Sequence, residues 1–314
     1  MDSDAVLRVA YRNKDVFERM NSMRNLRDET DVLMTGESIE PEAENFLRVT
    51  YRGNTAASKN AMRRVGLYPT DGDTGILMAE TIDPDDGLIG GYTDGRVVGI
   101  NTNVVPGTRQ YGRFRERIKR VQGQFGRYLY DKFGSYDLAA ESARYTLGHE
   151  DLHKKTQLNP MKKYDGKKSP VFRDELVDNL TERYRQNLPK ALRWLAKPLA
   201  HMSYRPLLEG LNEVTSENVF NGESTLSVRQ KRGNGPTTYD RPAAAAADSL
   251  YRIGVEEKMD RSYNGMDFYS DWADNPGKFM NRYINGFMEG LSKSYADNGM
   301  MMEISPACHY LKAA

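Results

Sequence analysis

Apolar residues recur every three or four positions over most of the chain beyond residue 108, and this spacing constrains the fold more than any other feature. From Thr108 to Phe133, one helical face carries Phe114, Ile118, Val121, Phe125, Tyr128 and Leu129. Prolines and glycines separate further helical patterns, which cover about 138–157, 173–187, 207–220, 243–254 and 279–295. The spacing therefore predicts a mostly helical protein.

A short stretch before these helices has a different pattern. Residues 86–105 contain two apolar runs on either side of Asp94-Gly95, which is typical of a type I′ turn between antiparallel strands. Residues 221–242 are rich in Gly, Asn, Thr and Pro, and this composition indicates a loop. The predicted fold class is α+β, mostly helical, with a small β-sheet preceding the helix at 138–157.

Charge and composition limit the possible partners. The 314 residues include 45 basic and 44 acidic side chains, so the formal net charge of +1 gives no overall field that attracts nucleic acid or a membrane. The single cysteine, Cys308, excludes an intrachain disulfide. Because the chain has neither a secretory leader nor a run of roughly 20 apolar residues, we expect a cytoplasmic protein. With 39% hydrophobic residues it can form a core, and we expect Trp194 and Trp272 to lie in this core or to pack between subdomains.

The most informative motif is His149-Glu150-Asp151-Leu152-His153, an H-E-x-x-H pattern in a segment with helical spacing. Residues four apart lie on one helix face, so both imidazoles can bind one cation. Glu150 lies about 100° around the helix from His149, where it can take a proton from a water beside that cation. The chain has only four histidines, and half of them are in this motif. The alternative is two surface histidines on a charged helix.

A third metal ligand is expected from the helix at 207–220. Glu209, Glu213 and Glu217 are spaced by four and line one face of it. Three carboxylates in a row repel one another by a few tenths of a kcal/mol per pair, and a nearby cation relieves that cost. The alternative is an ordinary acidic face in contact with solvent.

These two motifs together resemble the gluzincins, which are zinc metallopeptidases with an H-E-x-x-H helix and a downstream helical glutamate. The ligand glutamate of that family often lies in the string L-N-E-G-x-x-E, which Leu211–Glu217 matches closely apart from Val214. The resemblance covers roughly 86–290 and implies that Glu213 is the third zinc ligand. It also implies that Glu217 hydrogen-bonds a ligand histidine.

The resemblance implies a zincin-like catalytic domain at 81–300 that hydrolyses peptide bonds in a peptide or protein substrate, with Zn²⁺ as cofactor and Glu150 as general base. The strand pair at 86–105 is expected to include an edge strand that pairs with an extended peptide. Residues 1–80 are expected to form a pro- or accessory segment. The tail at 301–314 carries Cys308, which is either an inert terminal cysteine or a zinc ligand that keeps the enzyme latent.

Two points are left open by the sequence. By residue type alone, the candidates for stabilising the transition state are His201, Tyr204, Tyr239 and Tyr251. The alternative to a peptidase is a non-catalytic zincin-like binding or structural protein that retains the metal site.

Overall fold

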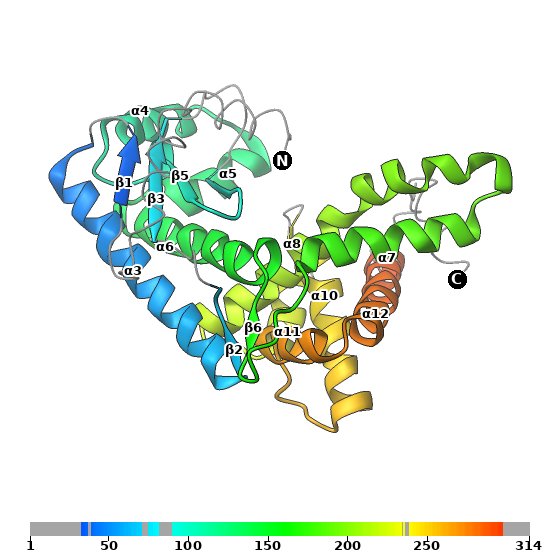
Figure 1. The fold of residues 1–314 in the computed structure, drawn as a ribbon. Helices are drawn as coiled ribbons and strands as arrows, with labels where there is room; N and C mark the ends of the chain where they lie inside the picture. The colour runs from blue at the N-terminus through cyan, green and yellow to red at the C-terminus, as the bar shows by residue number, and fades with distance from the viewer. Residues whose placement is uncertain are drawn as a thin grey trace. The chain divides into compact units, whose positions relative to one another are not determined.

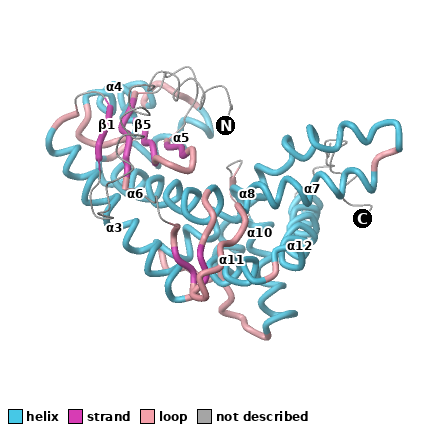
Figure 2. The backbone as a smooth tube through the Cα atoms, viewed as in Figure 1, coloured by secondary structure: helices cyan, strands magenta, loops and turns pink. Residues whose placement is uncertain are grey.

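The computed structural model describes residues 33–36, 39–70, 75–81, 90–233, 235 and 239–297. It confirms a mostly helical protein with a small sheet (Figure 2). Among the helices described, none is long and apolar enough to cross a bilayer. The segment 1–32 and the tail at 301–314 with Cys308 lie outside the described residues.

The chain divides into two compact units. The first contains residues 1–58 and 71–154, and the second contains residues 59–70 and 155–314. The boundary predicted at residues 80 and 81 falls instead inside the first unit, because the strand that ends at Glu80 pairs with a strand from the predicted catalytic domain.

A four-stranded sheet forms the centre of the first unit (Figure 1), with strand order β1-β3-β5-β4. The strands are β1 (Leu33–Gly36), β3 (Ile76–Glu80), β5 (Val98–Asn101) and β4 (Gly91–Thr93). The first three are parallel, whereas β4 is antiparallel to β5 and lies at the end of the order. The predicted strand pair is confirmed, and β4 is its edge strand.

The turn between β4 and β5 differs from the type I′ turn predicted for Asp94-Gly95. A type I′ turn needs positive φ at both central residues, and here only Gly95 has it, at 91°. The Asp94 carboxylate instead accepts hydrogen bonds from the backbone N–H groups of Arg96 and Val97, at 2.8 and 3.0 Å. An Asx-type turn therefore replaces the predicted one.

Helices pack around this sheet. They are α3 (Pro41–Arg64), which continues into the second unit beyond Ser58, η2 (Thr102–Val104), α4 (Arg109–Ile118), α5 (Gly123–Phe133) and α6 (Tyr136–Leu152). Their buried side chains form one core with Leu77, Ala79, Val98 and Ile100 of the sheet. The helix predicted over 108–133 is two helices, because the chain breaks before Gly123, whose φ of 83° is left-handed.

The α6 helix carries the H-E-x-x-H motif. It begins after Ser135, whose hydroxyl accepts a hydrogen bond from the Leu138 N–H, and it packs against β4 and β5. After Leu152 the backbone continues as a π-helix, η3 (His153–Leu158). The helical prediction for about 138–157 is therefore confirmed, although its last part has the wider π form.

The second unit is built almost entirely of helices. Its elements are β2 (Leu67–Tyr68), β6 (Lys162–Lys163), α7 (Phe172–Asn187), η4 (Lys190–Leu195), α8 (Ala196–Phe220), α9 (Thr225–Gly233), α10 (Asp240–Arg252), η5 (Ile253–Lys258), α11 (Gly265–Asp274) and α12 (Pro276–Asp297). Two predictions were wrong here. The α8 helix begins before residue 207 and includes Pro206, and α9 lies within the predicted loop at 221–242.

Small residues allow the helices of the second unit to pack closely. The alanines of α10, residues 243–247, are buried, and α10 contacts α8, α9 and α12. A Cβ atom on Gly210 of α8 would lie 2.4 Å from the carbonyl oxygen of Pro242, and one on Gly286 of α12 would lie 2.4 Å from the Ser249 hydroxyl oxygen. The contact between α8 and α10 therefore requires glycine at position 210.

We expect Gly210→Ala to lower the free energy of unfolding by about 1–3 kcal/mol, because the new methyl group meets backbone that cannot rotate away. Urea unfolding followed by circular dichroism measures this. Gly112→Ala is the matched control, since a Cβ there meets nothing within 4 Å. The control should be neutral or stabilising by up to about 1 kcal/mol. Equal effects of the two variants would contradict the packing argument.

Candidate metal centre

His149 and His153 lie one helical turn apart in the first unit, and their imidazoles meet. The two Nε2 atoms are 3.1 Å apart, and the ring centroids are 4.7 Å apart at an interplanar angle of 76°. Both side chains are buried. The structure therefore brings together the two histidines that the sequence assigned to one cation.

Two arrangements account for a separation of 3.1 Å. One imidazole can donate its Nε2–H to the other, or both nitrogens can face one metal ion. Nitrogen ligands 2.0–2.1 Å from a tetrahedral zinc ion lie about 3.3 Å from each other. The observed spacing is close to this value, so the separation of the two nitrogens is compatible with a shared zinc ion.

The helix changes form at the second histidine. The His153 N–H lies within hydrogen-bonding distance of the carbonyl oxygens of both Glu150 and His149, at the point where α6 passes into the π-helix. Wider π turns are rare and are frequently found at functional sites. The periodicity of the sequence gave no indication of this change.

Asp151 fixes the rotation of α6 about its axis. Its carboxylate is buried and accepts hydrogen bonds from the hydroxyl groups of Ser58, at 2.6 Å, and Thr55, at 3.2 Å, both on α3. The Asn54 side chain also donates to the Arg144 carbonyl at 2.7 Å. Sequence reasoning missed Asp151, because its partners lie more than ninety positions away.

Glu150 lies beside the edge strand. A Cβ atom on Gly91 of β4 would lie 3.0 Å from Glu150 Cγ and 2.6 Å from Thr146 Cγ2, so only glycine permits this approach of strand to helix. The next residue, Tyr92, is buried, and burial raises its pKa above the ordinary value, as do the carboxylates of Glu80, Asp94 and Glu150. The general-base candidate and the antiparallel edge strand are therefore neighbours.

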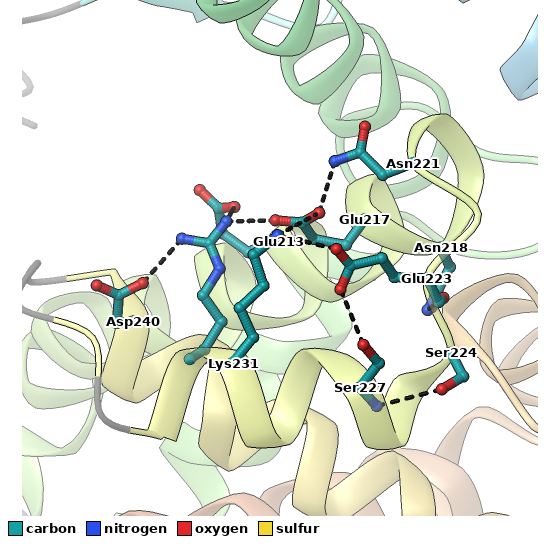
Figure 3. Close-up of polar contacts among 10 residues, drawn as sticks. Glu213, Glu217, Asn218, Asn221, Glu223, Ser224, Ser227, Lys231 and Asp240 are labelled. Atoms are coloured by element: carbon teal, nitrogen blue, oxygen red, sulfur yellow. Dashed lines mark hydrogen bonds and ion pairs between the residues drawn. The ribbon is translucent and has the colours of Figure 1, made fainter. Parts of the chain in front are cut away.

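The acidic row of α8 lies in the second unit, where two of its carboxylates meet an arginine. Arg232 of α9 contacts Glu217 through Nη2, and the same atom is 3.5 Å from Glu213 Oε2. Its Nη1 donates to Asp240 at 2.8 Å. Figure 3 shows Glu213, Glu217 and Asp240, with dashed lines marking their contacts. Arg232 is thus a counter-ion for Glu213 and Glu217, the last two carboxylates of the row.

Further donors surround Glu217, which is nearly fully buried. Asn221 Nδ2 donates to its Oε2 at 2.6 Å, and Lys231 Nζ lies 3.7 Å from the same oxygen. Lys231 also pairs with Glu223 at 2.9 Å, which lowers the pKa of Glu223 (Figure 3). Sequence reasoning assigned Glu217 to a ligand histidine and missed Lys231 and Arg232, because it predicted a loop where α9 lies.

We expect Arg232→Leu to lower the free energy of unfolding by about 2–4 kcal/mol, because it leaves buried carboxylates without their main counter-ion. The estimate is reduced from the value for fully buried pairs, since the arginine is partly exposed. Arg185→Leu is the control. It removes an exposed pair with Glu182 at 3.9 Å and should change stability by less than about 0.5 kcal/mol. Chemical unfolding of both variants checks this, and an unchanged midpoint for Arg232→Leu would contradict it.

The four candidates for stabilising a transition state lie at scattered positions in the second unit. His201 is exposed, with its ring centroid 6.3 Å from that of Tyr204, and it lies eight residues, or about 12 Å along the helix, before Glu209. Tyr239 is exposed and precedes α10, whereas Tyr251 lies near the end of that helix. Their proposed roles stay predictions.

No protein-family model, curated protein or solved structure matches this chain. The resemblance to gluzincins therefore stays a prediction that depends on the residues described above.

Proposed function

We propose that this chain is a zinc-dependent metallopeptidase in which His149 and His153 are metal ligands. The observation that carries the proposal is the separation of 3.1 Å between two buried Nε2 atoms on consecutive turns of α6. Buried imidazoles in this arrangement offer two nitrogen ligands at the spacing that tetrahedral zinc requires.

For the third protein ligand we propose Glu209, one turn before the Glu213 that the sequence motif suggests. The resemblance to gluzincins implies a third ligand from the acidic row of α8, and Glu209 is the first carboxylate of that row. Glu213 and Glu217 already have Arg232 as a counter-ion, and a second cation at those carboxylates would be repelled by it. Two histidines with one carboxylate form a common ligand set of catalytic zinc sites.

The edge strand supports a peptide as the substrate. Because β4 lies at the end of the sheet, an extended peptide can add to it through main-chain hydrogen bonds. Gly91 of this strand lies against Glu150, so a peptide bound there would run past the general-base candidate. Recognition through the peptide backbone also favours cleavage with broad sequence tolerance.

In the proposed reaction, the zinc ion and the side chains of α6 have separate roles. Zinc, when bound, lowers the pKa of a coordinated water to about 7 and polarises a carbonyl group. Glu150 accepts a proton from the attacking water and passes it to the leaving nitrogen, acting first as base and then as acid. Asp151 holds α6 in the orientation that both histidines require.

The test is incubation of the full chain, supplied with zinc, with a peptide library whose products are identified by mass spectrometry. We expect cleavage that a chelator abolishes and that added zinc restores. Retention of zinc without any cleavage would reject the peptidase and leave the non-catalytic metal-binding alternative. Cleavage that is unaffected by chelation would reject the metal mechanism.

The choice of α8 ligand gives a separate prediction. We expect Glu209→Ala to reduce zinc affinity by more than about 100-fold, because it removes a ligand, whereas Glu213→Ala changes affinity by less than about tenfold. Competition with a fluorescent chelator measures both affinities. The reverse result, with Glu213→Ala losing the metal and Glu209→Ala retaining it, would support the assignment made from the sequence motif.

A further inference from the structure

The turn of the α7–α8 hairpin exposes large apolar side chains. Figure 1 shows the two helices running side by side past α10 and α12 to this turn, which η4 forms. Trp194 is 72% exposed and Leu192 39% exposed in η4, and Met202 in the second turn of α8 is 74% exposed. The prediction that Trp194 lies in the core or packs between subdomains was therefore wrong.

The exposure of Trp194 does not reflect the absence of an apolar core in the second unit. The second tryptophan, Trp272, is fully buried in the same unit, with its ring centroid 5.0 Å from that of Phe172. A single exposed apolar residue is normal, but three within the short segment 192–202 of one hairpin are of the kind that marks an interaction site. The neighbours of this patch indicate the partner.

The same segment is strongly basic. Between Gln186 and Leu208 the chain has four basic side chains and no acidic one, the basic ones being Lys190, Arg193, Lys197 and Arg205. Within the described part of the chain none of the four has an ion pair. Elsewhere in the unit, Arg229, Arg252 and Arg282 all pair with carboxylates. The near-zero net charge of the whole chain thus conceals a local positive patch.

We propose that this hairpin turn binds the surface of an anionic lipid bilayer. Tryptophan is enriched where a membrane meets water, since its ring is apolar and its N–H is polar. Lysine and arginine beside it attract acidic headgroups, by about fivefold in affinity for each charge near the surface. A turn at the end of a helical hairpin can reach a flat surface without the rest of the unit intervening.

The apolar side chains favour lipid over the other polyanions. Burying Leu192 and Met202 at the boundary between headgroups and acyl chains makes the free energy of binding more favourable. A nucleic-acid backbone is charged and hydrated, so it would not bury these apolar side chains. The proposed attachment is through this surface turn, and its charge-dependent part is weakened by salt. The expectation of no membrane partner rested on the net charge of the whole chain. In that sum, the acidic residues elsewhere cancel the positive charge of this segment.

The experiment is sedimentation of the full chain with vesicles of phosphatidylcholine alone or mixed with phosphatidylserine. We expect binding only to the mixed vesicles, weakened by salt, together with a shift of tryptophan emission to shorter wavelength. Trp194 is the reporter, because Trp272 is already buried. Absence of binding to the mixed vesicles would overturn the proposal, as would binding to an RNA oligonucleotide in place of vesicles.

Variants of the turn locate the surface. Replacing Lys190, Arg193 and Lys197 by glutamine should weaken vesicle binding on the order of 100-fold, and Trp194→Ser should weaken it at least about tenfold and remove the emission shift. These side chains are exposed, so circular dichroism should be unchanged. The control replaces Arg113, Arg117 and Arg120 near α4, which are equally exposed, and should leave binding within about twofold. Equal loss in the control would overturn the proposal.

Discussion

Replacing Glu150 by glutamine should abolish peptide cleavage while leaving the fold and the metal in place. Glutamine keeps the shape of the side chain beside Gly91 but has no basic oxygen to accept a proton. A general base contributes about 10²–10⁴ to the rate, so the turnover number should fall by at least that factor. Initial rates on one peptide cleaved by the parent chain measure the effect.

The matched control is Glu141→Gln, which alters an exposed carboxylate near the beginning of the same helix. It should cleave at the rate of the parent. If Glu150→Gln retains the parent's turnover number, the proton must be accepted by another group, and the mechanism proposed for Glu150 is wrong. Loss of zinc from Glu150→Gln would instead indicate that Glu150 is a ligand.

His149→Ala and His153→Ala should each remove the stabilisation that zinc gives to the folded chain. A ligand that binds only the folded state stabilises it by about 4 kcal/mol when its free concentration is about 1,000 times the dissociation constant. Each variant lacks one of three protein ligands, so added zinc should raise its melting temperature little or not at all. Thermal unfolding with and without zinc, compared with the parent chain, measures this.

His201→Ala provides the comparison, since that imidazole is exposed and lies away from the histidine pair in sequence. It should respond to zinc as the parent does. A zinc-induced rise in melting temperature that is the same for His149→Ala as for the parent would show that the ion binds elsewhere. The comparison of His149→Ala and His153→Ala with the parent also distinguishes a metal site from a hydrogen bond between the imidazoles. With a hydrogen bond alone, the melting temperature of the parent would not depend on zinc.

The elements that sequence patterns predicted well are those whose stability depends on local spacing. The α7 helix spans Phe172–Asn187 against the predicted 173–187, because Pro189 ends it and its apolar face is regular. The β4–β5 pair was also found from two short apolar runs. The turn type was not, because the Asp94 side chain replaces the hydrogen bonding that a type I′ turn would use.

Other elements depend on partners far along the chain. The α8 helix continues back through Pro206 because α7 packs along it, which outweighs the local effect of proline. The alanines at 243–247 lie in a segment that the sequence predicted only as a helix, yet they are the surface on which α8, α9 and α12 pack. Single-sequence periodicity does not contain such contacts.

The residues of the candidate site also fall into those that local spacing predicts and those that depend on distant partners. His149 and His153 were predictable because the spacing of four on one helix is sufficient to bring them together. The counter-ion of Glu213 and Glu217 was not, because Arg232 lies on a helix whose composition resembles that of a loop. Asp151 lies inside the motif, but its role depends on Thr55 and Ser58 of α3.

The proposed function depends on whether the two imidazoles hold a metal ion. Native mass spectrometry of the full chain, expressed with zinc and dialysed without a chelator, measures this most directly. We predict a mass increment of one zinc ion per chain, and no increment for His149→Ala under the same conditions. A parent chain without bound metal, or a His149→Ala variant that retains it in full, would contradict the proposed site.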